Sequence, residues 1–515
     1  MRIGGASLTN QMPHHEARGA STTTRLSFVK GGLHLSTGQV ISQASSFLKS
    51  IIVARLISPA DYGIAAIFAM TFSLLEMISN LSAQTLLVQA EDGDNPRFES
   101  TIHFVHACRG LLNATLIFVL AGPVSHLFGA PQAKLAFECL ALVPLIRGFY
   151  HIDVNRFQRH MRFGPSVLVD SGSNLLVTLI ALPLAFWLRN YWAMLWLLVA
   201  QSACNLIGSH WLAERPYRWA WDRFFAKRMF HFGWPLTING LLMFGIFEGD
   251  RFVIGSAHHL FSRSNYTLTD LGVYSVAFAL TQASAMVGGN VLTALFLPLL
   301  SRAQGSRNQF ERRYLACTQI VSLLAVVVAT GFIVAGGTVV TLVYGQKYAA
   351  AGVFMGWLSA MWALRILRVA PTLAAMAYGD TRNAMVSNLA RSSALLGLLF
   401  VAATGRALVW IAVCGFLGEL VALVVCVWRL HLRHGVPAAL CFRPFAAFFV
   451  GAGVSALVVV GGIARLGLAP TFLGTACLIM MQALGMVYLF SGVREELAAL
   501  VLKLRSSLSV EKLPT

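Results

Sequence analysis

The chain has 515 residues, of which 57% are hydrophobic and only 12% are charged. Soluble domains carry roughly 25% charged residues, so this composition excludes a water-soluble protein. The formal net charge of +18 does not require a nucleic-acid partner, because basic loops facing anionic lipid head groups account for it.

Apolar runs recur from end to end, each long enough to cross roughly 30 Å of hydrocarbon as a helix. We predict an all-α polytopic membrane protein with about 14 transmembrane helices, after a polar and disordered tail at residues 1–29. The expected spans are 30–53, 64–87, 101–122, 135–153, 165–187, 192–213, 234–258, 273–300, 314–340, 350–378, 385–404, 408–428, 446–464 and 471–490.

A weak internal repeat indicates how these helices are grouped. The far ends of the first and seventh spans lead into Ser58–Gly63 and Thr267–Gly272, which both end in Asp-x-Gly before a helix rich in small residues. Such repeats are common in transporters. We therefore predict two pseudo-repeated six-helix lobes and two C-terminal helices, with the divisions 30–213, a linker at 214–233, 234–428, 446–490 and an amphipathic tail at 491–515.

Basic residues are distributed unevenly between the two sides of the membrane. Loops on the side of the N-terminus hold 25 of the 39 Lys and Arg residues, and the opposite loops hold seven. This asymmetry predicts that both termini are cytoplasmic. The opposite loops are short, the longest at about 259–272, so no catalytic domain can lie there. We expect no enzyme activity and no cofactor.

Charged side chains inside spans cost at least about 2.5–3.5 kcal/mol on insertion scales, which makes them candidates for function. Lys49 is expected near the far end of its span. Arg147, Asp153 and Asp170 are expected near the cytoplasmic face, where they can reach water. Arg109 and Arg391 also lie within spans.

Arg365 and Arg368 lie mid-span and share one helical face, since they are three residues apart. Two guanidiniums there favour a hydrated cavity that accepts an anion. The alternative is a network between helices, with Glu419 as the acid. In the seventh span, Glu248 and Arg251 are also three residues apart, and either form a structural ion pair or line the central cavity together with Asp250.

The candidate residues follow from these positions. For the substrate-binding cavity they are Arg251, Arg365, Arg368, Arg391, Arg109 and Lys49, and for ion coupling Glu248 and Asp250. We expect no metal site, because the eight cysteines lack metal-ligand spacing and His103 and His106 have no carboxylate motif beside them.

Six short passages, in order, resemble the polysaccharide transporter (Wzx-type flippase) family: Ala54–Gly63, Gly249–Gly255, Leu271–Ser275, Leu297–Arg302, Tyr344–Tyr348 and Tyr378–Arg382. The resemblance implies the superfamily of MATE exporters and the lipid II flippase. It also implies translocation of an undecaprenyl-diphosphate-linked oligosaccharide across the bacterial inner membrane by alternating access. Asp250 and Arg251 match the family's polar motif.

The resemblance names a lipid-linked oligosaccharide and membrane lipids as partners, with a polysaccharide polymerase and a chain-length regulator as candidate protein partners. The alternative is an ion-coupled small-molecule exporter of the MATE kind. Such exporters favour acidic cavities, whereas the deep charges here are mainly basic. A membrane polymerase or ligase needs a sizeable external loop, which this sequence lacks.

Overall fold

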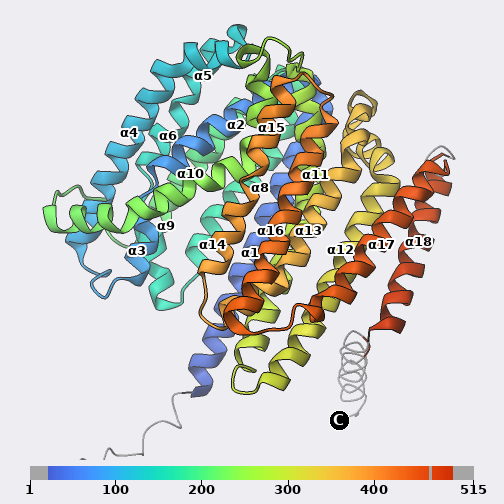
Figure 1. The fold of residues 1–515 in the computed structure, drawn as a ribbon. Helices are drawn as coiled ribbons and strands as arrows, with labels where there is room; N and C mark the ends of the chain where they lie inside the picture. Colours follow the sequence, from blue (N-terminus) through green and yellow to red (C-terminus); the bar gives the residue numbers. More distant parts are fainter. Residues whose placement is uncertain (1–20, 463–466, 491–493, 495–515) are drawn as a thin grey trace, which may run out of the picture.

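The computed structural model describes residues 21–462, 467–490 and Arg494, with side chains from Thr37 onward, and every regular element in this part is helical (Figure 1). The first half contains α1 Ser21–Leu56, α2 Pro59–Ser79, α3 Ala83–Gln89, α4 Pro96–Leu127, α5 Lys134–Leu140, α6 Leu142–Gly148, α7 Asp153–Arg156, α8 Gly164–Leu188 and α9 Trp192–Leu212. The second half contains α10 Arg223–Leu260, α11 Leu268–Ser301, α12 Arg307–Tyr344, α13 Gly352–Ala377, α14 Arg382–Arg391, α15 Ala394–Ala403, α16 Val409–His434, α17 Ala439–Val460 and α18 Leu468–Leu489.

The all-α membrane fold is confirmed, but the count of 14 spans is not. Twelve described helices are long and apolar enough to cross a membrane, and a pair bent by 52° raises the number to 13. Helix α1, which covers the expected first span, is not among them because it is polar where it packs on α8. There Ser46 donates a hydrogen bond to Asn174 at 3.2 Å, and Asn174 donates to Ser42 at 3.1 Å.

The two expected tails are only partly described. Residues 1–20 and, apart from Arg494, residues 491–515 lie outside the described part of the chain. Helix α1 begins at Ser21, so residues 21–29 are helical and the prediction of a disordered tail is wrong for them. The start of α1 and the end of α18 lie at the same end of the bundle (Figure 1).

Helix packing defines two lobes. In the N-terminal lobe, α1 packs on α8, α8 on α9, and α4 on α5 and α6. In the C-terminal lobe, α13 contacts α11, α12 and α16, while α14 and α15 pack on α16. The long helix α10 contacts both lobes, through α2 and α4 on one side and α15 on the other. Helices α17 and α18 both pack on α12, at the edge of the molecule (Figure 1).

The Asp-x-Gly repeat marks the ends at which α2 and α11 begin. The Ser58 hydroxyl accepts a hydrogen bond from the backbone N–H of Asp61 at 3.1 Å, and the Thr267 hydroxyl accepts one from the N–H of Asp270 at 3.2 Å. Both residues are N-caps, which satisfy amide groups that the first helical turn leaves unpaired. The repeated sequence therefore encodes the same helix start in both lobes.

The two glycines of the repeat lie where α2 and α11 meet. A Cβ atom on Gly63 would collide with the carbonyl oxygen of Leu268, and one on Gly272 would collide with the carbonyl oxygen of Pro59. The reciprocal contacts relate the two helix starts to each other by a local, approximate twofold axis. At the same end, Arg55 donates a hydrogen bond to the Val343 carbonyl oxygen at 2.7 Å. The lobes are therefore joined where α1 ends.

We predict that Gly272→Ala lowers the thermal stability of the purified protein, because the added methyl group pushes two backbones apart. Overpacking of this kind typically costs about 1–3 kcal/mol. The matched control is Gly453→Ala in α17, where no atom lies within 4 Å of the new Cβ. Scanning fluorimetry should show a lower midpoint for the first variant alone, and equal midpoints would contradict the close contact.

Candidate functional site

One buried carboxylate in the C-terminal lobe is shared by three arginines. The side chain of Glu419 on α16 is 0% exposed. Its oxygens lie 3.3 Å from Arg365 Nε, 3.4 Å from Arg368 Nη2 and 2.9 Å from Arg391 Nε. The interhelical network, considered as an alternative from the sequence, is therefore present.

Local sequence explains why these side chains converge. The three-residue spacing of Arg365 and Arg368 places both on the face of α13 that packs on α16. Gly418 lets the end of α14 approach α16, since a Cβ there would lie 3.1 Å from the Arg391 carbonyl oxygen and 2.6 Å from Ala394 Cβ. The missing side chain beside Glu419 thus brings Arg391 within reach of the carboxylate.

The three arginines differ in their surroundings. Arg368 also donates hydrogen bonds to Ser387 at 3.1 Å and to Asn388 at 2.8 Å. Its side chain and that of Arg391 are only 9% and 7% exposed. Arg365 is 19% exposed and lines a mostly apolar cavity of about 210 Å³ between α10, α11 and α13. We therefore regard Arg365 as the guanidinium of this network that a ligand can reach.

Aromatic rings hold Arg365 at the cavity wall. Its guanidinium carbon lies 4.3 Å from the ring centre of Phe247 and 4.9 Å from that of Trp362. Cation–π contacts of this kind stabilise a guanidinium in place of water. A planar guanidinium is well suited to bidentate contact with phosphate or carboxylate oxygens.

The charged group on α10 lies close to this network. Arg251 Nη2 is 2.8 Å from Glu248 and Arg251 Nε is 4.0 Å from Asp250, so the structural ion pair, one of the two alternatives drawn from the sequence, forms. Tyr274 on α11 donates a hydrogen bond to Asp250 at 2.8 Å. Both acids that we considered for ion coupling therefore have partners in this conformation.

The balance of charge in this cluster of side chains is positive. Four guanidiniums, those of Arg251, Arg365, Arg368 and Arg391, accompany the three carboxylates of Glu248, Asp250 and Glu419. Buried charges are costly unless they are paired. One positive charge in excess, with Arg365 at a cavity wall, suits an anionic ligand.

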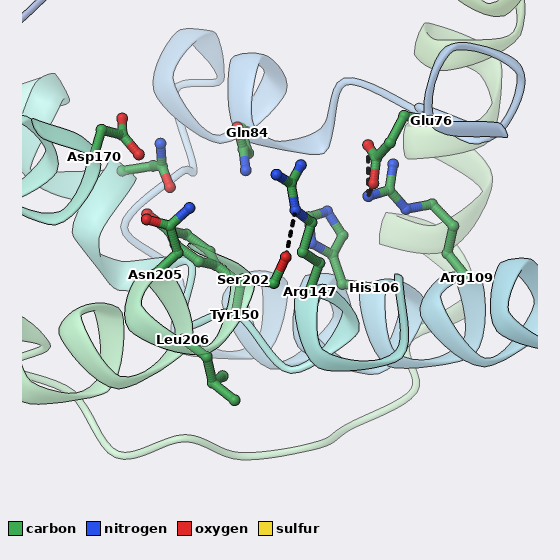
Figure 2. Close-up of a pocket in the computed structure, with 11 residues that line it drawn as sticks. Glu76, Gln84, His106, Arg109, Arg147, Tyr150, Asp170, Ser202, Asn205 and Leu206 are labelled. Atoms are coloured by element: carbon green, nitrogen blue, oxygen red, sulfur yellow. Dashed lines mark hydrogen bonds and ion pairs between the residues drawn. The ribbon is translucent and has the colours of Figure 1, made fainter. Parts of the chain in front are cut away.

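Two of the candidate residues lie elsewhere. Arg109 belongs to the N-terminal lobe, where its Nη2 is 3.4 Å from Glu76 at the edge of a polar cavity (Figure 2). Lys49 lies on α1 and forms no ion pair among the described residues. The sequence prediction thus combined residues from separate places.

Of three other charges that were expected to reach water, one does not. Arg147 is half-buried and Asp170 is exposed, and both line the N-terminal cavity. Asp153 is 0% exposed and lies 2.5 Å from Arg156. Asn205 and Asn155 line the same cavity but were not predicted as site residues, because the prediction rested on charged side chains alone. The spacing of Ser202 and Asn205, three residues apart in an apolar span, was the available signal.

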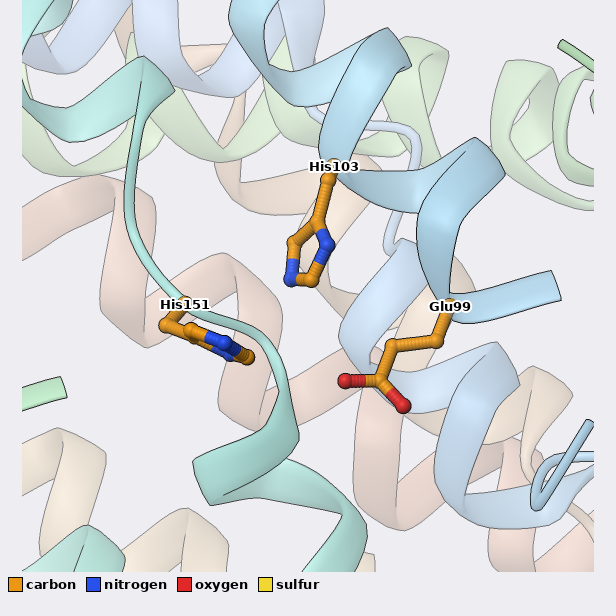
Figure 3. Close-up of side chains that lie close together, drawn as sticks. All are labelled: Glu99, His103 and His151. Atoms are coloured by element: carbon orange, nitrogen blue, oxygen red, sulfur yellow. The ribbon is translucent and has the colours of Figure 1, made fainter. Parts of the chain in front are cut away.

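Glu99, His103 and His151 form the group of the described chain that most resembles a metal site (Figure 3). Both ring nitrogens of His103 are already occupied, by the backbone N–H of Ile152 and the carbonyl oxygen of Arg218, each at 3.2 Å. Glu99 pairs with Arg215 at 2.9 Å. This group therefore fastens the linker after α9 to the N-terminal lobe, and we assign no metal to it.

The arrangement of helices matches solved transporters. The lipid II flippase MurJ, in an inward closed conformation, gives a TM-score of 0.65 at 12% identity, covering 88% of this chain and 98% of MurJ. An inward-facing multidrug resistance MATE family transporter of the MOP superfamily gives 0.57 at 13% identity, covering 78% and 98%. The fold defines the class as a multi-pass membrane protein with this transporter architecture.

Sequence comparison gives the family. Residues 52–352 match the family described as polysaccharide biosynthesis protein, so the chain belongs to it, as the resemblance implied. The succinoglycan biosynthesis transport protein ExoT of Rhizobium meliloti (strain 1021) is 24% identical over 328 residues. That alignment covers 62% of this chain and 64% of ExoT, less than two thirds of either.

We predict that Glu419→Gln destabilises the protein by at least about 3 kcal/mol, because it removes the shared counter-charge of three buried guanidiniums. The control is Glu138→Gln, whose partner Lys134 is 59% exposed, so the loss should stay below about 1 kcal/mol. Adding Arg391→Gln to Glu419→Gln should recover part of the lost stability. Thermal unfolding of the four proteins checks this, and equal midpoints for the two Glu variants would contradict the network.

Proposed function

We propose that this protein is a flippase for an undecaprenyl-diphosphate-linked oligosaccharide, serving the assembly of exopolysaccharide, capsule or O-antigen. Membership of the polysaccharide biosynthesis family and the MurJ-like fold support a lipid-linked cargo. The protein carries no covalent chemistry in this proposal. Its task is to replace the solvent that a glycan and a diphosphate lose in the bilayer.

The observation that carries the proposal is the position of Arg365 at the wall of a mostly apolar cavity. Arg368 and Arg391 stay paired with Glu419 and hold the carboxylate, so Arg365 can turn to a phosphate without leaving Glu419 uncompensated. Apolar side chains around the same cavity suit the lipid segment next to the diphosphate. One site thus offers a cationic contact for the diphosphate of the carrier and an apolar contact for its lipid.

An ion-coupled exporter of the MATE kind is the second candidate, because its fold is similar. Such exporters act on cations, for which the excess of guanidiniums in the C-terminal lobe is unfavourable. The charge of this cluster therefore favours the lipid-diphosphate cargo.

The membrane and its sidedness belong to the same proposal. We place the chain in the bacterial inner membrane with both termini in the cytoplasm, since the basic loops lie on that side. The contact between Gly63 and Gly272 would then close the periplasmic end. A polymerase and a chain-length regulator would receive the cargo there.

We predict that Arg365→Gln slows flipping at least about tenfold, because a hydrogen bond to a charged group contributes about 1.5–3 kcal/mol. The measurement is the initial rate at which a fluorescent undecaprenyl-diphosphate-linked saccharide crosses proteoliposome membranes.

Arg302→Gln, which changes an exposed arginine after α11, is the matched control and should keep the wild-type rate. Arg365→Gln should insert and unfold normally, since Glu419 retains two guanidiniums. A wild-type rate in a well-folded Arg365→Gln protein would remove Arg365 from the site.

A further prediction concerns energy coupling by the acids on α10. One charge moved across 100 mV corresponds to about 2.3 kcal/mol, enough to drive a cycle. We expect an imposed proton gradient to accelerate flipping in the wild type, and Asp250→Asn to remove that acceleration. Glu138→Gln serves as the control. Equal wild-type rates with and without the gradient would show that protons are not coupled.

A further inference from the structure

We infer that the polar cavity of the N-terminal lobe binds one sugar residue of the transported glycan. The inference rests on the proposed flippase function and adds a second subsite to it, separate from the arginine cluster. The cavity lies between α2, α3, α4, α6, α7, α8 and α9 (Figure 2). Its volume is about 180 Å³, room for roughly six waters at about 30 Å³ each, or for one pyranose ring with its hydroxyls.

Hydrogen-bonding groups of both kinds are unoccupied around this cavity. Arg147 donates through Nε to Ser202 at 3.3 Å, and its terminal nitrogens have no hydrogen-bond partner among the described residues. The Asp170 carboxylate has no ion pair or hydrogen bond there either. The amide oxygens of Asn155 and Asn205 are buried without partners. The wall thus presents free donors and free acceptors together.

Among these groups the oxygens of Asn155 and Asn205 are buried, and leaving them unpaired is costly. A buried donor or acceptor left unsatisfied costs about 1–3 kcal/mol, so such groups in a folded protein usually meet water or a ligand. A sugar hydroxyl is both a donor and an acceptor. A ring bearing several hydroxyls can therefore satisfy Arg147, Asp170 and the two asparagines at once.

The charge of the cavity distinguishes a sugar from an ion. Arg109 and Arg147 are matched in number by Glu76 and Asp170, so the lining is neutral overall. An anion would meet the open carboxylate of Asp170, and a cation would meet the guanidinium of Arg147. A neutral polyol is repelled by neither charge. The Tyr150 ring at the same wall offers an apolar face for the C–H side of a pyranose.

The position of the cavity suits a glycan whose lipid carrier is bound in the other lobe. Glu76 and Arg109, which retain 23% and 16% exposure, form the ion pair at one edge of the cavity (Figure 2). Glu76 lies on α2, the helix through which the N-terminal lobe contacts α10 and α11. A carrier held by its diphosphate at Arg365 could therefore extend its sugar toward this side.

The test compares two probes on the full-length protein in lipid nanodiscs. One probe is undecaprenyl diphosphate without sugar, and the other carries a single glucose or galactose. The variant is Asn205→Leu, which replaces the amide by an apolar side chain of nearly the same size. Folding should tolerate it, because losing an unpaired buried polar group is neutral or stabilising. The control is Gln201→Leu, one helical turn away on α9, where an unpaired buried amide does not line the cavity.

We expect Asn205→Leu to weaken binding of the sugar-bearing probe about three- to tenfold, the loss of one hydrogen bond, and to leave the bare probe unchanged. Gln201→Leu should change neither, and Arg365→Gln should weaken both. Unchanged binding of the glucose and galactose probes by Asn205→Leu, or equal weakening of both probe types, overturns the sugar subsite alone. Absence of binding of any probe to the wild type overturns the flippase proposal itself.

Discussion

The buried carboxylate of Glu419 is the interaction on which the C-terminal lobe depends. A guanidinium inside a membrane domain needs a partner, and here α13, α14 and α16 are held together because three guanidiniums need the same one. This arrangement fixes two arginines and leaves the third at a cavity wall. The same charges therefore stabilise the lobe and, in the function proposed above, would receive an anion.

Sequence alone could predict much of the fold, and the reasons are physical. The hydrocarbon thickness sets the length of apolar runs, so most spans were found within a few residues of their helices. Helix α1 was expected as the first span, yet it is less apolar than the other spans, and its serines form hydrogen bonds with α8. The repeat at Gly63 and Gly272 was visible as a motif, but its role in a helix crossing required coordinates.

The site was harder to predict because partners come from distant segments. Spacing placed Arg365 and Arg368 on one face, yet which of them would face a cavity depended on Ser387, Asn388 and Phe247. The expected water contact failed for Asp153, whose carboxylate is 0% exposed and pairs with Arg156. Uncharged amides carry little signal in an apolar sequence, although they determine which ligand a neutral cavity can hold.

The two cavities differ in a way that suits a cargo with two chemistries. The C-terminal lobe carries excess positive charge beside apolar walls, and the N-terminal lobe offers a neutral set of donors and acceptors. Because the lobes meet closely at Gly63 and Gly272, rocking about that crossing would change the distance between the cavities. A carrier bound at both would then favour one lobe arrangement over another. A bare diphosphate would engage only one cavity, which gives a physical basis for selecting loaded carriers over empty ones.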